Sequence, residues 1–273
     1  MKTVNILGVP IAAVNVEQAA AEIEDWIRRD QKTFVTVTGV HGIMESQREG
    51  QVKRIHEAAG MCVPDGMPTV WVGRFCGYKS MDRVYGPDLM LEMMGRSVAG
   101  GYTHFFYGGK EGVPELLRDR LLAKFPGVKV VGVFSPPFRP MSAKEENELE
   151  DLIETLSPDV TWVGLSTPKQ ERWMAAHVGK LNTKVMVGVG AAFDFHAGLV
   201  RQAPRWMQRS GIEWFFRLCT EPRRLWRRYL FNNPMFIWMI LGQLLGQNKD
   251  DPEEEFSSSQ SPLSTSSRER KLM

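Results

Sequence analysis

Residues 1–190 alternate short runs of β-branched and aromatic residues with amphipathic stretches of helical length. This alternation is typical of an α/β domain, in which helices cover a mostly parallel sheet. The expected strands are Thr33–Val37, Gly60–Val63, Thr103–Tyr107, Lys129–Phe134, Val160–Gly164 and Lys184–Val189. The expected helices are Val16–Arg29, Gly42–Glu49, Pro87–Val98, Val113–Lys124, Ala143–Thr155 and Lys169–His177. We therefore expect a Rossmann-like fold, with helices on both faces of the sheet.

The character of the chain changes at about Arg201. Tryptophan, arginine and proline crowd together up to Gln247 without a strand-like run, which predicts a helical appendage over residues 201–247. Residues 248–273 are polar and rich in serine, so they cannot repay the entropy of ordering and are expected to form a disordered tail. The α/β domain is accordingly assigned to residues 1–200.

Composition narrows the function classes. A chain of 273 residues with 43% hydrophobic residues can build a full core, and its net charge of only +2 does not favour a nucleic-acid partner. The 3 cysteines are too few and too scattered for a disulfide framework or a CxxC metal site, which indicates a reducing cytosol. The N-terminus lacks the pattern of a secretion signal, and the longest apolar run, Pro234–Leu245, is too short to span a membrane.

Several polar residues follow predicted strands, where ligands bind in α/β sheets. Asp65, followed by Gly66, is a candidate base, although an Asp-Gly pair is also common in plain turns. Thr36 and Thr38, near the end of another strand, could bind a sugar hydroxyl, or could simply reflect the preference of β-branched residues for strands.

Three further strand ends carry candidate substrate-binding groups. Gly109 belongs to a glycine-rich turn whose amides suit a diphosphate, but the turn lacks the dinucleotide and phosphate-loop fingerprints. The run Lys169-Gln170-Glu171 begins a helix and predicts a substrate clamp, with an ordinary solvated first turn as the alternative. Gly190 and Asp194 follow the last strand, where small residues permit close approach of a ligand or a helix.

Together these motifs resemble the WecG/TagA/CpsF family of glycosyltransferases. The resemblance spans roughly residues 5–246 and follows the family's order and spacing. It rests on Pro64-Asp65-Gly66, Arg83-Val84-x-Gly86-x-Asp88, Pro168-Lys169-Gln170-Glu171, Gly211-Ile212-Glu213-Trp214 and Arg217-Leu218.

The resemblance implies an inverting transfer of a sugar from a UDP-sugar to a polyprenyl-diphosphate-linked saccharide. It implies that Asp65 is the general base, that Thr38, or alternatively Thr36, shapes the pocket, and that Arg83 and Gln170 hold the donor. Val40 stands where the family has an asparagine, so the donor sugar could be N-acetylmannosamine or another hexose. We expect no cofactor and no obligatory metal.

The appendage interleaves arginines with aromatic residues, a composition that favours a membrane surface. The resemblance places it over the active site, with Arg217, Arg224 and Arg227 directed toward the donor, and places the protein at the cytoplasmic face of the membrane. The same residue types also suit a homo-oligomer interface. A nucleotide-dependent oxidoreductase and a catalytically silent membrane scaffold remain the alternative functions.

Overall fold

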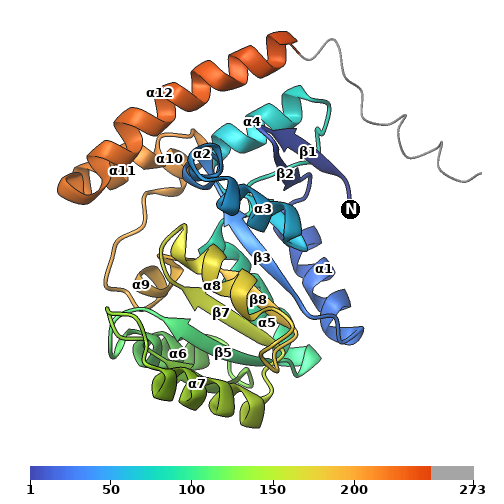
Figure 1. Ribbon diagram of the computed structural model, residues 1–273, viewed down its shortest axis with the longest axis vertical. Helices are drawn as coiled ribbons and strands as arrows, with labels where there is room; N and C mark the ends of the chain where they lie inside the picture. Colours follow the sequence, from blue (N-terminus) through green and yellow to red (C-terminus); the bar gives the residue numbers. More distant parts are fainter. Residues whose placement is uncertain (247–273) are drawn as a thin grey trace, which may run out of the picture.

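A single sheet of eight strands runs through the protein in the order β1-β2-β4-β3-β8-β7-β5-β6 (Figure 1). The computed structural model describes residues 1–246, so the predicted tail over 248–273 and Gln247 lie outside the described residues. The strands are β1 Thr3–Ile6, β2 Val9–Ala12, β3 Thr33–Thr38, β4 Met61–Pro64, β5 Thr103–Gly108, β6 Lys129–Phe134, β7 Val160–Gly164 and β8 Val185–Gly188. All neighbouring pairs are parallel except β1 and β2. The six predicted strands are confirmed; the short β1–β2 hairpin was not predicted.

Helices cover both faces of this sheet, as predicted. They are α1 Val16–Arg28, α2 Val40–Arg48, α3 Gly50–Ala58, α4 Met67–Phe75, α5 Gly86–Gly100, α6 Val113–Lys124, α7 Ala143–Leu156, α8 Lys169–His177, α9 Ala192–His196, α10 Arg205–Arg209, α11 Glu213–Thr220 and α12 Pro222–Gly246. One core packs α1, α5, α6 and α9 against the sheet, and another packs α3, α7 and α8 against the opposite face. The central strands are apolar on both sides because each side is buried.

The helix ends follow from local sequence. Asn15 is the N-cap of α1 and Ser142 is the N-cap of α7, and each forms a capping box with the Gln or Glu three residues later. Helix α4 lies outside the expected helix ranges, because its apolar sequence MPTVWVGRF lacks a clear helical period. It is nevertheless helical, with a proline in its first turn.

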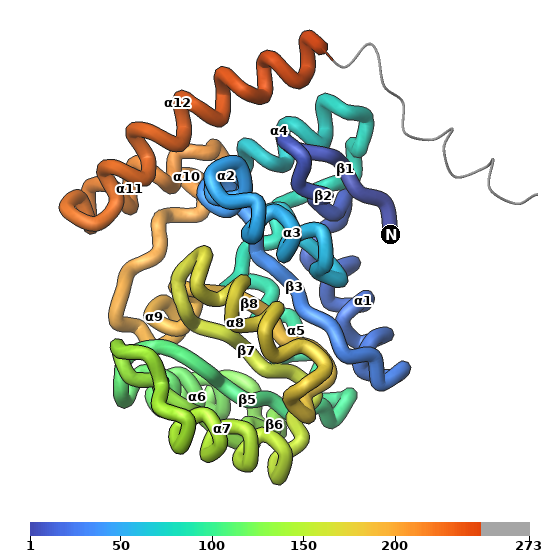
Figure 2. The backbone as a smooth tube through the Cα atoms, in the orientation of Figure 1, coloured from blue at the N-terminus to red at the C-terminus, as the bar shows by residue number. Residues whose placement is uncertain are grey.

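The predicted helical appendage is present as α10, α11 and the long α12, which crosses the molecule beyond the carboxyl ends of the strands (Figure 2). Helix α12 packs against α2, and its buried residues are Leu225, Asn232, Phe236 and Ile240. Gln243 near its end accepts a hydrogen bond from the Leu7 amide at 2.8 Å and donates one to the Asn5 carbonyl at 2.7 Å. Neither α12 nor any other helix within residues 1–246 has the length and apolar character needed to span a membrane.

Candidate active site

A cavity of about 580 Å³ lies between the carboxyl edge of the sheet and the appendage. The segments that follow β4, β3, β8 and β7 form its floor, and these four strands are consecutive neighbours in the sheet. Helices α11 and α12 contribute the opposite wall. The carboxyl ends of parallel strands are the usual ligand site in an open α/β sheet, so the topology gathers the predicted motifs into one place.

Asp65 stands at the floor of this cavity, directly after β4. Its backbone amide donates a hydrogen bond to the Thr38 carbonyl at the end of β3, at 3.0 Å. A Cβ atom added to Gly39 would lie 2.7 Å from the Asp65 carbonyl oxygen, so glycine permits the close approach of the two strand ends. The Asp65 side chain is 33% exposed, and it lines the cavity.

Arg83 connects Asp65 to the appendage. The Val84 amide donates to the Pro64 carbonyl at 2.8 Å, which holds the Arg83 segment beside the end of β4. Arg83 Nη2 lies 3.5 Å from Asp65 Oδ1 and 2.5 Å from Glu213 Oε2 on α11. The guanidinium group therefore bridges the catalytic-base candidate and the first residue of α11.

The environment of Asp65 favours proton uptake. Burial raises its pKa, the Arg83 charge opposes that rise, and the nearby Glu213 carboxylate adds to it. The Oδ1 atom is buried without a hydrogen-bond partner. A carboxylate that has a raised pKa and is partly exposed to a cavity has the properties required of a general base.

Three arginines of the appendage, Arg217, Arg224 and Arg228, line the cavity. Arg217 and Arg224 both form ion pairs with Glu221, and Arg217 Nη2 lies 4.0 Å from Glu221 Oε1. Within residues 1–246, Arg228 forms no ion pair, and burial lowers its pKa because the charge has lost its hydration. The Nε atoms of Arg217 and Arg228 are buried without a hydrogen-bond partner. This cluster is suited to bind a diphosphate.

Arg227, the third arginine predicted to reach the donor, lies elsewhere. Its side chain is exposed and sits over the Trp226 ring, 5.2 Å from the ring centroid. It is not among the residues that line the cavity, whereas the neighbouring Arg228 is. Arg224, Arg228 and Asn232 share a helix face at intervals of four residues, and that spacing was the sequence signal for Arg228.

The ends of β7 and β8 supply further polar groups to the cavity. Gln170 is 2% exposed, and its Oε1 atom has no hydrogen-bond partner. Asp194 also lines the cavity, and burial raises its pKa against the opposing charges of Lys110 and Arg224. Gly66 and Gly190 form parts of the wall in backbone conformations with φ of 87° and 51°.

Other predicted residues lie near the cavity without lining it. Thr36 and Thr38 are buried beneath the floor, where the Thr38 hydroxyl donates to Thr36 Oγ1 at 2.9 Å. Glu171 is buried behind Gln170 and accepts hydrogen bonds from Thr167 at 2.9 Å and from Gln170 at 3.2 Å. Burial raises the pKa of Glu171. The remaining two, Gly109 and Lys169, do not contribute to the lining, and Lys169 is exposed.

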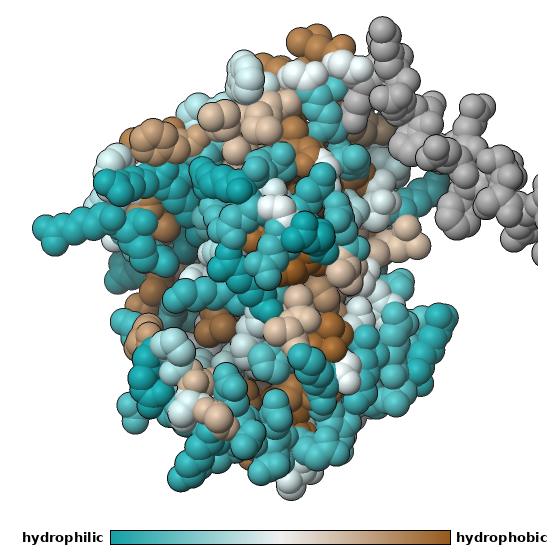
Figure 3. Space-filling model, viewed as in Figure 1, coloured by the Kyte–Doolittle hydropathy of each residue, from teal (hydrophilic) through white to brown (hydrophobic). Residues whose placement is uncertain are grey.

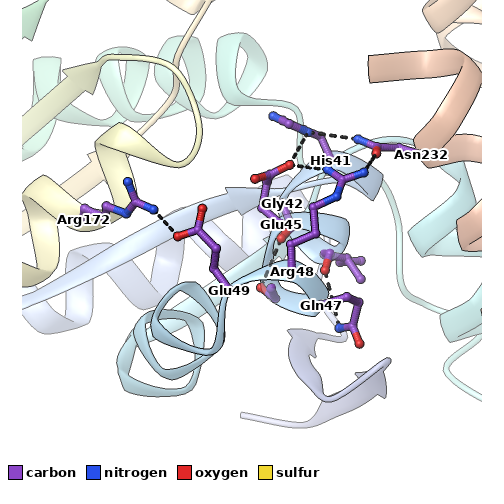
Figure 4. Close-up of polar contacts among 10 residues, drawn as sticks. His41, Gly42, Glu45, Gln47, Arg48, Glu49, Arg172 and Asn232 are labelled. Carbon is purple, nitrogen blue, oxygen red and sulfur yellow. Dashed lines mark hydrogen bonds and ion pairs between the residues drawn. The ribbon is translucent and has the colours of Figure 1, made fainter. Parts of the chain in front are cut away.

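A partly buried polar cluster that the sequence did not reveal joins α12 to α2 at the cavity wall, and its buried member is Asn232 (Figure 4). Asn232 accepts a hydrogen bond from Arg48, and its Nδ2 lies 3.1 Å from His41 Nδ1. Burial and the Arg228 charge lower the pKa of His41 to about 3, so its neutral ring accepts this bond. Glu45 completes the cluster, because its Oε1 atom lies 2.5 Å from Arg48 Nη1 and 3.7 Å from His41 Nδ1.

We expect Asn232→Leu to lower the free energy of unfolding by about 1–3 kcal/mol, because Arg48 and His41 then lose a buried partner. Urea unfolding followed by circular dichroism measures the change. Phe231→Leu, at the neighbouring position whose side chain is 61% exposed, is the control and is expected to change stability by less than about 0.5 kcal/mol. Equal urea midpoints for the two variants would show that the polar cluster does not hold the appendage.

Comparison with known proteins gives a consistent result. Residues 4–250 match the profile of the glycosyl transferase WecG/TagA/CpsF family. Three relatives are named N-acetylglucosaminyldiphosphoundecaprenol N-acetyl-beta-D-mannosaminyltransferase. The Bacillus spizizenii protein is 27% identical over 216 residues, 79% of this chain and 81% of the relative. The Bacillus subtilis protein is 30% identical over 201 residues, which cover 72% of this chain and 75% of the relative. The Staphylococcus aureus protein is 24% identical over 239 residues, which cover 87% of this chain and 91% of the relative.

Proposed function

The chain belongs to the WecG/TagA/CpsF family of glycosyltransferases, and from this premise we propose that it transfers a sugar, with inversion, from a UDP-sugar to a polyprenyl-diphosphate-linked saccharide. The names of the relatives supply the acceptor class, since they specify a saccharide on diphosphoundecaprenol. The observation that carries the proposal is the partly buried Asp65 carboxylate in the same cavity as three appendage arginines. The product would enter a cell-surface polysaccharide or an exopolysaccharide.

In the proposed reaction, Asp65 accepts the proton of the acceptor hydroxyl as the oxygen attacks the anomeric carbon. The bond between that carbon and the donor diphosphate breaks on the opposite face, which inverts the configuration. Arg217, Arg224 and Arg228 bind the departing nucleoside diphosphate and neutralise its developing charge. Because these guanidinium groups supply the positive charge, we propose that the transfer proceeds without a divalent metal.

The remaining polar wall would orient the donor sugar. Gln170 presents an unsatisfied Oε1 atom, and Asp194 presents a carboxylate with a raised pKa. Both are acceptors for sugar hydroxyl or amide groups. Arg83 is fixed between Asp65 and Glu213, so we assign it the positioning of the base and the appendage in addition to donor binding. Thr36 and Thr38 would act from beneath by fixing the floor.

A donor panel tests this proposal. The enzyme is incubated in detergent with UDP-, GDP- and CMP-linked sugars, with and without a short-chain polyprenyl-diphosphate N-acetylglucosamine. We expect nucleotide release from a UDP-sugar only when the lipid-linked acceptor is present. Release that does not depend on the acceptor, or that occurs only with a GDP- or CMP-sugar, would contradict the proposed donor and acceptor pair.

We also propose that the protein binds the cytoplasmic membrane surface peripherally through α12. Apolar side chains on the outward side of this helix are exposed, and Figure 3 shows apolar residues along the edge of the molecule over α12. They are Trp226, Leu230, Phe231, Met235, Trp238 and Leu245, while Ile237 and Leu241, which are also exposed, line the cavity. Arg223 and Arg227 are exposed on the same helix and would attract anionic headgroups. A homo-oligomer interface is the alternative use of this surface.

The double variant Phe231→Ser, Trp238→Ser is expected to bind anionic vesicles about 30-fold or more weakly, because two aromatic side chains no longer insert into the interface. Vesicle co-sedimentation measures the partition coefficient. Phe138→Ser is the control, since Phe138 is 90% exposed but follows β6, at the far edge of the sheet from β1 and β2. A loss of binding in the control equal to that in the double variant would exclude α12 as the specific docking element, and an unchanged double variant with a concentration-dependent oligomer would favour the interface.

A further inference from the structure

The cavity has an apolar arm that the transfer reaction leaves unexplained. Beyond the polar floor it continues between α4 and α12. The residues of this arm, which we name the α4–α12 groove, are Met67, Trp71, Val72, Phe236, Ile237, Ile240 and Leu241. Val72, Phe236 and Ile240 are 7%, 4% and 6% exposed and belong to one core cluster. Trp71, Ile237 and Leu241 are 49%, 58% and 54% exposed. The groove therefore has a packed base and an open apolar mouth.

The two ends of this cavity differ in chemistry. One end holds Asp65 and the arginines, which suit a diphosphate and a sugar hydroxyl, and the other end holds only hydrocarbon and indole surface. A nucleotide-sugar has no hydrocarbon part that would cover such a surface. Apolar surface that stays in contact with water is unfavourable, and exposed apolar patches beside a site mark ligand-binding grooves or membrane contacts.

We propose that the α4–α12 groove binds the first isoprene units of the acceptor, so that the hydrocarbon chain enters the site between α4 and α12. This inference rests on the proposed function, because it names where the lipid part of that acceptor lies. A polyprenyl-diphosphate-linked saccharide combines in one molecule a sugar hydroxyl that can reach Asp65 and a run of apolar isoprene units that fits the groove. The groove then contributes to recognition of the chain as well as the sugar.

The position of the groove supports a route from the membrane. Ile237 and Leu241 stand one turn apart at its mouth, while Trp238 and Leu245, 73% and 84% exposed, occupy the adjacent outward side of the same helix. The outward side is the part of α12 that we assign to the membrane surface. A prenyl chain can therefore pass from the bilayer into the groove along continuous apolar surface.

Photolabelling tests the location of the chain without requiring turnover. The probe is a farnesyl diphosphate analogue with a benzophenone group on its tail, and tandem mass spectrometry locates the label. We expect labels within residues 67–75 and 236–241 on groove-facing positions such as Trp71 and Ile237, and no competition by UDP. Labels confined to Trp226, Phe231 and Trp238, or labels in the groove that UDP removes, would overturn the proposal, since the tail would then lie on the outer surface or the groove would belong to the nucleotide.

Acceptor selectivity in detergent micelles provides the second test, with chain length as the variable. We compare kcat/KM for acceptors with a long prenyl chain and with a single isoprene unit, in the double variant Ile237→Asn, Leu241→Asn. We expect the long-to-short ratio to fall about tenfold or more, equivalent to about 1.4 kcal/mol. Val98→Asn, Leu122→Asn is the matched control, with the same chemical change at exposed apolar positions of α5 and α6 outside the cavity, and it should keep the wild-type ratio.

The two experiments distinguish a wrong groove assignment from a wrong proposed function. Equal ratios in the groove variant, the control and the wild-type protein would overturn the groove assignment while leaving the transferase intact. Absence of turnover with every acceptor would contradict the proposed function, and the position of the photolabel would still decide whether the groove binds a prenyl chain. Thermal unfolding of each variant confirms that a changed ratio does not arise from loss of the fold.

Discussion

Replacing Asp65 with asparagine lowers acceptor-dependent turnover by about 10²- to 10⁴-fold, the usual contribution of a general base. The amide keeps the size and shape of the side chain but cannot accept the proton of the attacking hydroxyl. Asp119→Asn removes a carboxylate that is 63% exposed on α6, outside the cavity, and serves as the control with wild-type turnover. Steady-state release of nucleoside diphosphate measures all three proteins. Equal, measurable rates for Asp65→Asn and wild type would remove Asp65 from the mechanism, and absence of turnover in both proteins would favour the silent-scaffold alternative.

The same carboxylate should set the acid limb of the pH profile. Burial raises the pKa of Asp65, and a base acts only when deprotonated, so kcat/KM should fall as the pH drops through a value above the ordinary aspartate pKa of about 3.9. Arg83→Gln removes the charge that opposes this rise, and it should shift the acid limb to higher pH. A limb at the ordinary aspartate value in the wild type would contradict this assignment.

Arg228→Gln lowers turnover by about 10²- to 10³-fold, whereas Arg227→Gln keeps it within about twofold of wild type. Arg228 lines the cavity with a buried Nε atom that lacks a partner, so it is available to neutralise the departing diphosphate. Arg227 faces outward over Trp226, and the assay is made in detergent so that membrane binding does not contribute. The pair is adjacent in sequence and identical in chemistry, which makes each variant a control for the other.

Thermal unfolding distinguishes catalysis from stability in this comparison. Removal of an unpaired buried charge relieves a desolvation penalty, so Arg228→Gln should unfold at or above the wild-type temperature. A large loss of activity in Arg227→Gln with normal turnover in Arg228→Gln would mean that the appendage binds the donor through its other face.

The strands and most helices could be predicted because local sequence determines them. Buried parallel strands have runs of β-branched and aromatic residues, and Asn15 and Ser142 are N-cap residues that mark where two helices start. The β1–β2 hairpin could not be predicted in this way, because each strand has only four residues and its turn places Leu7 at a φ of 52°. Its position depends on tertiary contacts, including those from Gln243 in α12.

The site residues that follow strands could be predicted from the sequence. Those on helices were harder to predict, because the rotation of a helix about its axis determines which side chains face the cavity. Asp65 follows β4 at the carboxyl edge, and the sequence indicates that position directly. Gln170 and Lys169 are adjacent, yet one is buried against the cavity and the other is exposed. Which of Arg227 and Arg228 faces inward depends on how α12 rotates against α2, and the buried Asn232 cluster fixes that rotation. Contacts between residues so distant in sequence are not visible in a local pattern.

The nucleotide-dependent oxidoreductase considered from the sequence is not supported, because the chain belongs to a glycosyltransferase family. Val40, which replaces an asparagine of the family pattern, lines the cavity at the start of α2. An apolar side chain at this wall offers no hydrogen bond to the donor that we propose to bind there. A hexose other than N-acetylmannosamine is therefore a proposal to be tested with the donor panel.

The most direct test of the account is the mass of the lipid product. Purified protein is treated with EDTA and incubated with the UDP-sugar panel and a polyprenyl-diphosphate N-acetylglucosamine, and the extracted lipid is measured by mass spectrometry. We predict a lipid product heavier by one sugar residue, formed in the presence of EDTA by wild-type protein and at least about a hundredfold more slowly by Asp65→Asn. A lipid that keeps its original mass with every donor, or a product that appears only when a divalent metal is restored, would contradict a metal-independent transfer that depends on Asp65.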